Sequence, residues 1–562
     1  TRIETVPETG TMGANSTVNG TLAVGTAAGQ TFQTGDTINA NATSIVNVNV
    51  VADNANTVAI NNAKAVNFRN LTGAATAAAN TNAILWTGVG TFASNQSLGA
   101  VGLANGAKAT NYSLSNSIAG QADGLNIGLR AADVAGTSDT INFQVNAVGT
   151  AGNTAAGVAA TNSALTTNAT GIEGIAVATT GRNFFTVTGN TTAATDSATL
   201  TLTGAGTNDV TIAAGGMAAT SSIVASGLTN ALNLNVGTNL STGDSVTGGS
   251  GADVLRATVN GLVAANLNIS AIETLRVESG AANATLAFTG APAFTNLRVD
   301  QGAAQALRSF LNIGTFTNLN YVGTGTTAGV AIADAFSPVT ITGGFAGTTD
   351  TLAVNFSNGG RTRTAGGNYT VGTAVLTSTG VETYTVNVAD TTSNAITTTL
   401  QGITDNGGLT SVRAVSNGNI VLGAITATGA ANTGTLTSID FTGVTGTNAV
   451  SSVNTVNNSL AAASLVTAGA SGLNYTLNGA EQAADILNFV GGVGADTLTA
   501  TLYRGNVVAS GGAGIDTFTL GVSGAGGAVA TAALTGGAGG DVFQINEVTA
   551  ATISDFGNGV DS

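Results

Sequence analysis

Four short segments combine glycine and aspartate at a spacing suited to binding a divalent cation. Each reads Gly-Gly-x-Gly-x-Asp and carries an apolar residue two positions after the aspartate; they span 248–255, 491–498, 511–518 and 536–543. Glycine permits turn conformations that are closed to other residues and that point carbonyl oxygens inward, and the aspartate adds an anionic oxygen. Ca²⁺ prefers six to eight oxygen ligands, which two stacked turns can supply together. The sequence therefore predicts calcium ions between successive turns.

The predicted metal ligands are the aspartates of these turns, the glycines beside them and neighbouring acids. A Gly-Asp pair nine residues before Asp253 extends the mid-chain motif, and Asp485 is interpreted as part of a degenerate turn that begins the last stack. The predicted metal-binding residues are Gly243, Asp244, Gly249, Gly251, Asp253, Asp485, Gly492, Gly494, Asp496, Gly512, Gly514, Asp516, Gly537, Gly539, Asp541, Asp555 and Asp561.

The spacing of the aspartates predicts where the ions would lie. Asp496, Asp516 and Asp541 are 20 and 25 residues apart, so successive coils would carry them on one edge. Asp244 and Asp253 are only nine apart and would occupy both edges. The alternative is that the aspartates merely cap the local backbone, as in Asx turns. This alternative is stronger for the looser copies at Asp36, Asp139, Asp209 and Asp350.

The residues that are absent exclude several kinds of chemistry. The 562 residues contain no Cys and no His, and only two Lys. Disulfides, thiolate or imidazole metal sites and triads built on His or Cys are therefore excluded. The net charge of -15 makes nucleic acid an improbable partner and divalent cations a favoured one. Charged residues make up 8% of the chain, against about 25% in typical domains, so its surface is mainly neutral and suited to packing against an identical neighbour.

Alternating apolar and polar residues predict strands throughout the chain, as in 46–50, 141–145 and 381–388. The 79 Gly leave room for at most a few short helices, for example near 116–132 or 301–311. Similar cassettes recur, and the 22-residue step from Phe294 to Phe316 is about one solenoid coil. We therefore expect an all-β chain of elongated parallel β-solenoid or β-roll segments, with a β-sandwich as the alternative for the first 240 residues.

Disorder and membrane insertion are both disfavoured by the composition. The chain is 43% hydrophobic, whereas disordered chains lack apolar residues. No uninterrupted apolar stretch approaches the roughly 20 residues that a spanning helix requires. The sequence therefore predicts a folded chain with no membrane-spanning segment.

The turns, together with two Ile/Val-Glu-Thr cassettes (272–277 and 381–386) and an Ala/Thr/Gly/Asn-rich composition without Cys, resemble RTX-type bacterial surface-layer (S-layer) proteins. The closing segment 553–561 is similar to the cap that follows the repeats in this family. On this basis we expect an N-terminal β-rich repeat region over 1–240, a central β-solenoid region over 241–478 that opens with a calcium turn, and a C-terminal RTX β-roll with its cap over 479–562.

The resemblance implies a structural protein and not an enzyme. Such a chain would leave the cell by type I secretion, fold outside on binding Ca²⁺ and assemble with copies of itself into a two-dimensional lattice on the cell surface. Complete members also carry an anchoring region and a secretion signal, so we expect further sequence beyond residue 562. Cell-surface polysaccharide or lipopolysaccharide would be contacted through a region outside this chain.

Two other functions are compatible with the same scaffold. An RTX-type calcium-dependent adhesin or extracellular matrix protein would bind a glycan or a host surface, although the sequence shows no aromatic platform for a sugar. An RTX glycosidase would need a pair of acids in general acid and base roles. The candidate acids, such as Glu273 and Glu382, already have turn roles or lie singly in strands.

Overall fold

The computed structural model describes two compact units. The first comprises Thr1–Thr258 and Asn266–Glu273, and the second comprises Val259–Ala265 and Thr274–Ser562. The described residues are 8–22, 31–51, 58–71, 79–151, 161–167, 170–192, 195–278, 281–301, 306–323, 334–357, 368–372, 375–388, 396–427, 434–446, 451–456, 459–478, 484–501, 503–521, 529–557 and 561–562.

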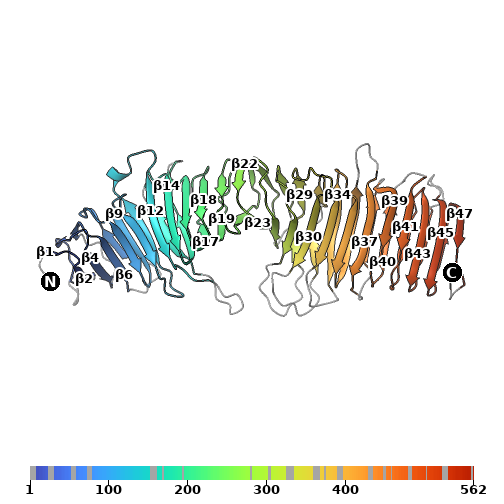
Figure 1. Cartoon of the computed structure of the whole chain (residues 1–562), viewed down its shortest axis with the longest axis horizontal. Helices are drawn as coiled ribbons and strands as arrows, with labels where there is room; N and C mark the ends of the chain where they lie inside the picture. The colour runs from blue at the N-terminus through green and yellow to red at the C-terminus, as the bar shows by residue number, and fades with distance from the viewer. Residues whose placement is uncertain are drawn as a thin grey trace. The chain divides into compact units, whose positions relative to one another are not determined.

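In the first unit, most strands stack as successive rungs of two sheets (Figure 1). One sheet contains β2 (Thr17–Leu22), β4 (Ile45–Val50), β6 (Ala65–Asn70), β8 (Thr91–Asn95), β10 (Asn111–Ser115), β12 (Thr140–Asn146), β14 (Gly174–Thr180), β16 (Thr199–Gly204), β18 (Ser222–Leu228), β20 (Ser245–Thr247) and β22 (Val263–Ser270), of which residues 266–270 belong to this unit. The other contains β7 (Ala79–Asn82), β9 (Ala100–Gly106), β11 (Gly124–Leu129), β13 (Ser163–Thr167), β15 (Arg182–Thr188), β17 (Thr207–Ile212), β19 (Leu232–Gly237) and β21 (Val254–Thr258). A small third sheet contains β1 (Thr9–Thr11), β3 (Thr37–Asn39) and β5 (Ala59–Asn61).

The second unit repeats this arrangement. One sheet contains β24 (Ala284–Phe288), β26 (Arg308–Leu311), β28 (Asp334–Phe336), β29 (Val339–Thr342), β31 (Tyr369–Val371), β32 (Leu376–Ser378), β34 (Thr397–Asp405), β36 (Asn419–Ala427), β38 (Ser451–Val456), β40 (Leu473–Asn478), β42 (Thr497–Ala500), β44 (Thr517–Leu520) and β46 (Val542–Ile545). The other contains β23 (Thr274–Glu278), β25 (Asn296–Asp300), β27 (Asn318–Val322), β30 (Thr351–Ser357), β33 (Thr383–Val388), β35 (Ser411–Ser416), β37 (Leu436–Val444), β39 (Leu460–Thr467), β41 (Ile486–Val490), β43 (Asn506–Ala513), β45 (Val529–Ala538) and β47 (Val548–Ile553).

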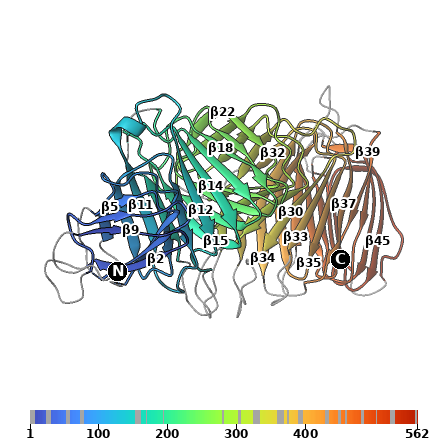
Figure 2. The same cartoon turned by 60° about the vertical axis from the view of Figure 1, so that its left-hand side comes forward.

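The strand pairings identify both units as parallel β-solenoids. Each described pairing between named strands is parallel, for example β12 with β14 in the first unit (Figure 2) and β42 with β44 in the second. The antiparallel contact in the described ranges is an isolated bridge between Thr150 and Thr161. The expected solenoid is confirmed, and the β-sandwich alternative for the first 240 residues is wrong, because a sandwich would pair its strands antiparallel.

The expected short helices are not formed. In the range 116–132, residues 124–129 form β11, which is followed by a single 3₁₀ turn, η1 (Ala131–Asp133). The second range ends in β26, and its residues 302–305 lie outside the described part. Alternating burial explains the strands, because an extended chain places every second side chain in the interior. Among the described residues, no helix is long and apolar enough to span a bilayer.

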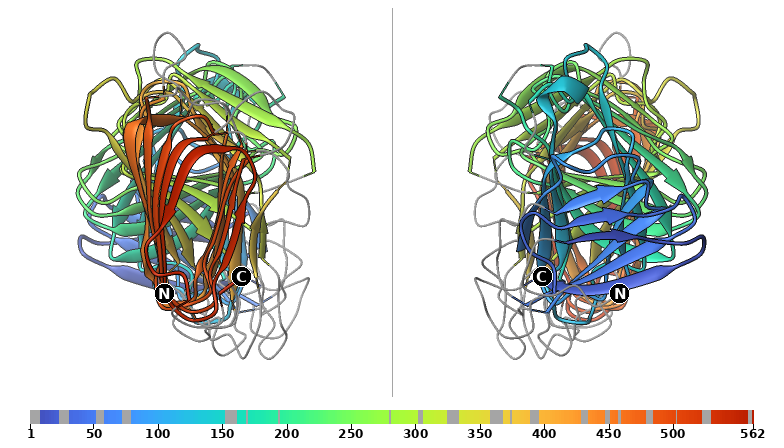
Figure 3. Two further views of the ribbon diagram at one scale, coloured as in Figure 1. Left: turned by 90° about the vertical axis from the view of Figure 1, so that its right-hand side faces the viewer. Right: turned by 90° about the vertical axis from the view of Figure 1, so that its left-hand side faces the viewer.

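The interior of each coil is filled by the inward-facing side chains. β33 alternates between half-buried and buried residues along its whole length, and in-register pairing stacks like positions of successive coils (Figure 3, left, for the orange and red strands of the second unit). The two sheets also meet across the interior: Phe489 of β41 contacts Tyr475 of β40 and Phe518 of β44, with ring centroids 6.4 and 6.5 Å apart. A coil cannot bury this face alone, so each is stabilised by its neighbours.

Truncating a stacked ring should therefore destabilise the coils around it. We expect Phe489→Ala, at a side chain only 1% exposed, to lower the free energy of unfolding of these coils by about 3 to 5 kcal/mol. Hydrogen exchange of the β41 and β43 amides measures this change. The matched control, Val508→Ala on the outer face of β43, should stay within about 0.5 kcal/mol of the unsubstituted protein. Equal effects of the two substitutions would contradict the assigned core.

Candidate metal centre

Three turn aspartates of the second unit are buried along one edge of the solenoid. Asp496, Asp516 and Asp541 immediately precede β42, β44 and β46, and these strands pair consecutively in one sheet. Each aspartate is at most 1% exposed. The structure thus places on one edge the three carboxylates that the spacing assigned to one edge.

Each carboxylate in this row is hydrogen-bonded to the coil before it. The amide of Asp496 donates to Oδ1 of Asp516 (2.7 Å), and the amide of Asp516 donates to Oδ1 of Asp541 (2.9 Å). Beyond Asp541 lies Asp561, whose Oδ1 accepts the amide of Asp541 at 2.9 Å and whose Oδ2 accepts the amide of Gly557. We call the row of Asp496, Asp516 and Asp541 the aspartate ladder, and Asp561 follows its last member. The ladder ties each coil to the next through a side chain.

The two carboxylate oxygens of Asp496, the first residue of the ladder, accept amides from different coils. Asp496 Oδ2 accepts the amide of Gly492 in its own turn (2.7 Å), and Oδ1 accepts the amide of Leu473 in the preceding coil (2.6 Å). One oxygen therefore closes the turn, while the other connects two coils.

The mid-chain motif in the first unit follows the same rule. Asp253 Oδ2 accepts the amide of Gly249 (2.6 Å), and Oδ1 accepts the amide of Leu232 from the preceding coil (2.8 Å). Asp244 accepts the amides of Ser241 and Ser221 in the same way. Asp244 precedes β20 and Asp253 precedes β21, so they lie on the two different sheets, as their spacing predicted.

The remaining predicted acids lie apart from the ladder. Asp485 precedes β41, in the sheet that does not contain β42, and its main-chain oxygen accepts the amide of Asn506. Residues 479–483 of its predicted degenerate turn lie outside the described residues. Asp555 accepts the amides of Gly536 and Gly537 at 2.9 and 2.7 Å. It therefore braces the last glycine turn from the C-terminal side.

The predicted glycines lie where the coils approach most closely. Gly537 has a φ of +102°, which side-chain-bearing residues rarely adopt. At Gly511, a Cβ would collide with Asp516 Oδ2 and with the carbonyl oxygen of Gly536, so both oxygens lie against this glycine. A positive φ is also found at Gly243, Gly512, Gly514 and Gly539, and close backbone of the preceding coil is found beside Gly249, Gly251, Gly492 and Gly494.

Three of the four looser copies adopt a related turn, one residue shorter than that of Asp253 and Asp496. Asp36, Asp139 and Asp350 each precede a strand and accept, through Oδ2, the amide of the residue three positions earlier. Asp209 does not, because it lies inside β17, where its Oδ1 accepts the side-chain amide of Asn233. The backbone-capping alternative therefore describes the hydrogen bonds of these turns.

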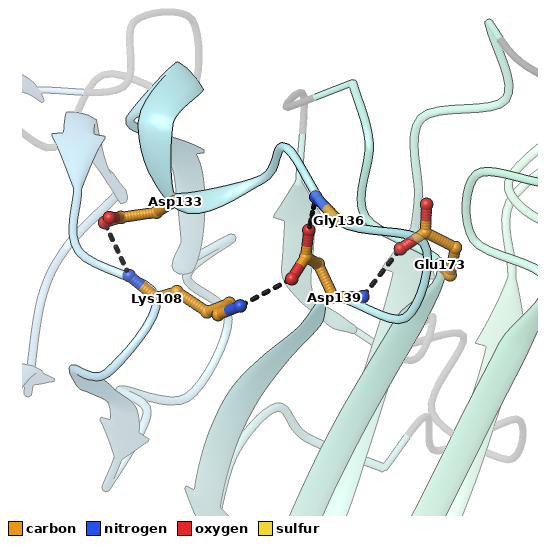
Figure 4. Close-up of polar contacts among 5 residues, drawn as sticks. All are labelled: Lys108, Asp133, Gly136, Asp139 and Glu173. Carbon is orange, nitrogen blue, oxygen red and sulfur yellow. Dashed lines mark hydrogen bonds and ion pairs between the residues drawn. The ribbon is translucent and has the colours of Figure 1, made fainter.

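Three glutamates complete the turns and were not among the predicted ligands. Oε2 of Glu173, Glu273 and Glu382 accepts the amide of Asp139, Asp253 and Asp350 respectively, at 2.6 to 2.7 Å (Figure 4 for Glu173). Each glutamate accepts the amide of a turn aspartate in the preceding coil, as Asp516 and Asp541 do in the ladder. The Ile/Val-Glu-Thr cassettes in the sequence could have identified Glu273 and Glu382 as turn residues, since each cassette follows an aspartate turn by one coil.

The ladder concentrates negative charge without a basic partner. Burial raises the pKa of Asp496 to about 6, and burial together with the charges of Asp496 and Asp541 raises the pKa of Asp516 to about 6. Within the described residues, no Lys or Arg forms an ion pair with these three aspartates. Amides donate to each of these carboxylates but do not neutralise their charge.

One ladder oxygen has a geometry that fits a hard cation. Asp516 Oδ2 is buried and has no hydrogen-bond partner, and it lies with the carbonyl oxygen of Gly536 against Gly511. A carboxylate and a carbonyl are ligands that Ca²⁺ prefers. Within the part of the chain that the structure describes, no three acidic, His or Cys side chains gather closely enough to hold a metal. A bound ion would therefore need main-chain oxygens as well.

Comparison with known proteins does not extend this assignment. The chain matches no protein-family model and no curated protein sequence.

The raised pKa values predict an unusual pH dependence when no divalent cation is present. Between about pH 4 and pH 6 the folded state binds more protons at Asp496 and Asp516 than the unfolded state, so the free energy of unfolding should fall as the pH rises. The loss should be on the order of 2 kcal/mol per carboxyl. Urea denaturation in buffer passed over a chelating resin measures it.

The control for this prediction is the double variant Asp496→Asn with Asp516→Asn. It should show a smaller slope, the remainder coming from Asp123, Asp244 and Asp253, whose pKa values burial also raises. The pKa of Asp139 is shifted downward by its hydrogen bond to Lys108, so its contribution changes below about pH 4, outside this window. Stability that is flat or rises between pH 4 and 6 would contradict the burial of uncompensated carboxylates.

Proposed function

We propose that this chain is an extracellular structural protein whose β-solenoid is tightened by Ca²⁺ at the aspartate ladder and which assembles with copies of itself as a bacterial surface layer. The observation that carries the proposal is the row of three buried, adjacent carboxylates, Asp496, Asp516 and Asp541, which form no ion pair with a Lys or Arg among the residues that the structure describes. A divalent cation would remove the repulsion between them. It would also convert a hydrogen-bonded contact between coils into an ionic one.

The ligand chemistry supports calcium over softer metals. The chain has no Cys or His, so any site must be made of oxygen donors. Asp516 Oδ2 and the carbonyl oxygen of Gly536 would be the first ligands, and a bound ion would supply the positive charge that the ladder lacks. Extracellular calcium modules bind at about 10⁻⁴ to 10⁻³ M. Such a site would fill outside the cell and not in the cytosol.

The outer surface of the solenoid supports self-association. The outward positions of the strands carry Thr and Asn, as in the hydrogen-bonded row of Asn19, Asn47 and Asn67 on β2, β4 and β6. Neutral, short side chains on a repetitive sheet allow close contact between identical molecules without charge repulsion. Stacked coils also provide the extended surface that repeat proteins use for binding.

An adhesin is the second candidate, and a cavity in the first unit favours it. The cavity measures about 580 Å³ and is lined in part by Asn105, Asn126, Leu129 and Thr170. Asn126 Oδ1 is buried without a hydrogen-bond partner, and the lining residues that the structure describes carry no charged side chain. A neutral hydroxylated ligand fits this chemistry. Binding on a glycan array that Asn126→Ala abolishes, with no ordered assembly in calcium, would replace the coat function by this one.

Calcium binding can be tested at the ladder itself. The double variant Asp516→Asn with Asp541→Asn should weaken the binding of Ca²⁺ at least about tenfold, or about 1.4 kcal/mol, because it removes two anionic ligands. Isothermal titration calorimetry measures this, with circular dichroism to establish that the variant is folded. The control Asp209→Asn removes one charge inside β17 and should bind as the unsubstituted protein does. An unsubstituted protein that takes up no Ca²⁺ would refute the calcium site.

Assembly is tested by imaging the purified full chain by negative stain with millimolar calcium and with chelator. We expect ordered sheets in calcium and their loss in chelator, because carboxylate repulsion loosens the coils that form the contact surface. A chain that remains monomeric at high concentration in saturating calcium would rule out the coat function.

A further inference from the structure

At one aspartate turn of the first unit, a lysine of one coil reaches the aspartate of the next coil, whose amide in turn contacts a glutamate of the third. Lys108 Nζ lies 2.5 Å from Asp139 Oδ1, and the amide of Asp139 donates to Oε2 of Glu173 at 2.6 Å (Figure 4). The amide of Lys108 donates to Asp133 Oδ2, which fixes the loop that carries the lysine. Lys108, Asp139 and Glu173 precede β10, β12 and β14, which are consecutive strands of one sheet.

The lysine occupies a position that other turns give to a backbone amide. Oδ1 of Asp253 and Oδ1 of Asp496 each accept an amide of the preceding coil, from Leu232 and Leu473. At Asp139 the preceding coil contributes the ammonium of Lys108 instead. Oδ2 of Asp139 keeps the usual bond to the amide of its own turn, at Gly136. In all three turns Oδ2 accepts an amide of its own turn, three positions earlier at Asp139 and four at Asp253 and Asp496, whereas the donor to Oδ1 differs in kind.

This exchange changes the charge of the turn. An amide leaves the aspartate with its full negative charge, whereas an ammonium neutralises it. The Asp139 side chain is 7% exposed and that of Lys108 is 42% exposed, so the carboxylate is enclosed while the lysine reaches it from the surface. The second unit has a parallel case away from the ladder, because Arg276 and Arg298 both contact the buried Asp300, at 2.5 and 2.6 Å.

We propose that Lys108 is a built-in counterion that lets the coils of β10, β12 and β14 hold their turn without a divalent cation. The contrast with the aspartate ladder rests on the proposed function, which gives the ladder a calcium ion. The role of Lys108 as a counterion of Asp139 does not rest on the proposed function. The inference divides the turns into two classes: those neutralised by a side chain of the chain itself, and those that draw a cation from solution.

Hydrogen exchange of the full chain, with and without chelator, tests this division. In the unsubstituted protein the peptide covering 136–142 should exchange equally in both conditions, whereas peptides over 492–518 should exchange faster in chelator. Lys108→Met should speed exchange of the 136–142 peptide at least about tenfold in chelator, which corresponds to about 1.4 kcal/mol. Lys108→Arg should preserve most of the protection because it keeps the charge.

The other lysine of the chain provides a matched control. Lys64 is exposed, and Lys64→Met makes the same chemical change, so it should leave the 136–142 peptide unaltered. The proposal is overturned if Lys108→Met exchanges as the unsubstituted protein does. It is also overturned if chelator exposes the 136–142 peptide of the unsubstituted protein as much as the ladder peptides.

A measurement on the unsubstituted protein covers the case in which the methionine variant does not fold. Raising NaCl from about 0.05 to about 1 M screens a partly exposed ion pair, so protection of the 136–142 peptide in chelator should fall, and unchanged protection would contradict the role of Lys108. Ladder peptides that ignore chelator would refute the proposed calcium function alone. The comparison of Lys108→Met with Lys64→Met would still decide the role of the lysine.

Discussion

The hydrogen bond from a backbone amide of one coil to a buried aspartate of the next is the interaction on which the turns of both units depend. A parallel solenoid pairs its strands through the main chain, and this pairing extends into the glycine turns, but it does not satisfy every amide of the turns. Asp496, Asp516 and Asp541 each accept an amide that would otherwise lack a partner. Buried amides without partners are costly, so these side chains hold the turns of adjacent coils in register.

The same interaction places negatively charged carboxylates in the interior, where their charge is destabilising unless a cation lies nearby. A carboxylate that accepts two amides is well hydrogen-bonded, yet it keeps its charge in a place with little water. In the C-terminal row, burial and like charges raise the pKa of Asp516, and its second oxygen remains without a partner. Where a basic side chain is within reach, as at Asp139, the charge is neutralised inside the chain. The proposed calcium would perform the same task from outside.

The packed interior and the aspartate turns specify different features of the fold. Aromatic contacts between the two sheets, such as that of Tyr475 with Phe489, supply apolar burial, which is non-directional. The aspartate turns are sensitive to small shifts between coils, because a displaced coil would lose an amide donor for each carboxylate. We infer that burial drives coils together and that the turns determine which residues meet. This division is consistent with a sequence rich in small apolar residues and poor in charge.

The sequence by itself determined the strand periodicity, the coil length and the positions of the turn aspartates. These are local properties: alternation reports which side chains face inward, and glycine beside aspartate reports a turn. It also placed Asp496, Asp516 and Asp541 on one edge, because spacing near one coil length leaves them in equivalent positions. It left the first 240 residues open between solenoid and sandwich, because alternation is the same in parallel and antiparallel strands.

Only the tertiary structure decided what each carboxylate contacts. Glu173 reaches Asp139 across 34 residues, and Lys108 reaches it across 31. Neither distance follows from a motif, because loops of different length separate the coils. The sequence named calcium as the partner of the turn aspartates. In the structure, the aspartate oxygens accept amides of the adjacent coil. The stacking of coils brings backbone N–H groups and buried carboxylates together, with or without a bound ion.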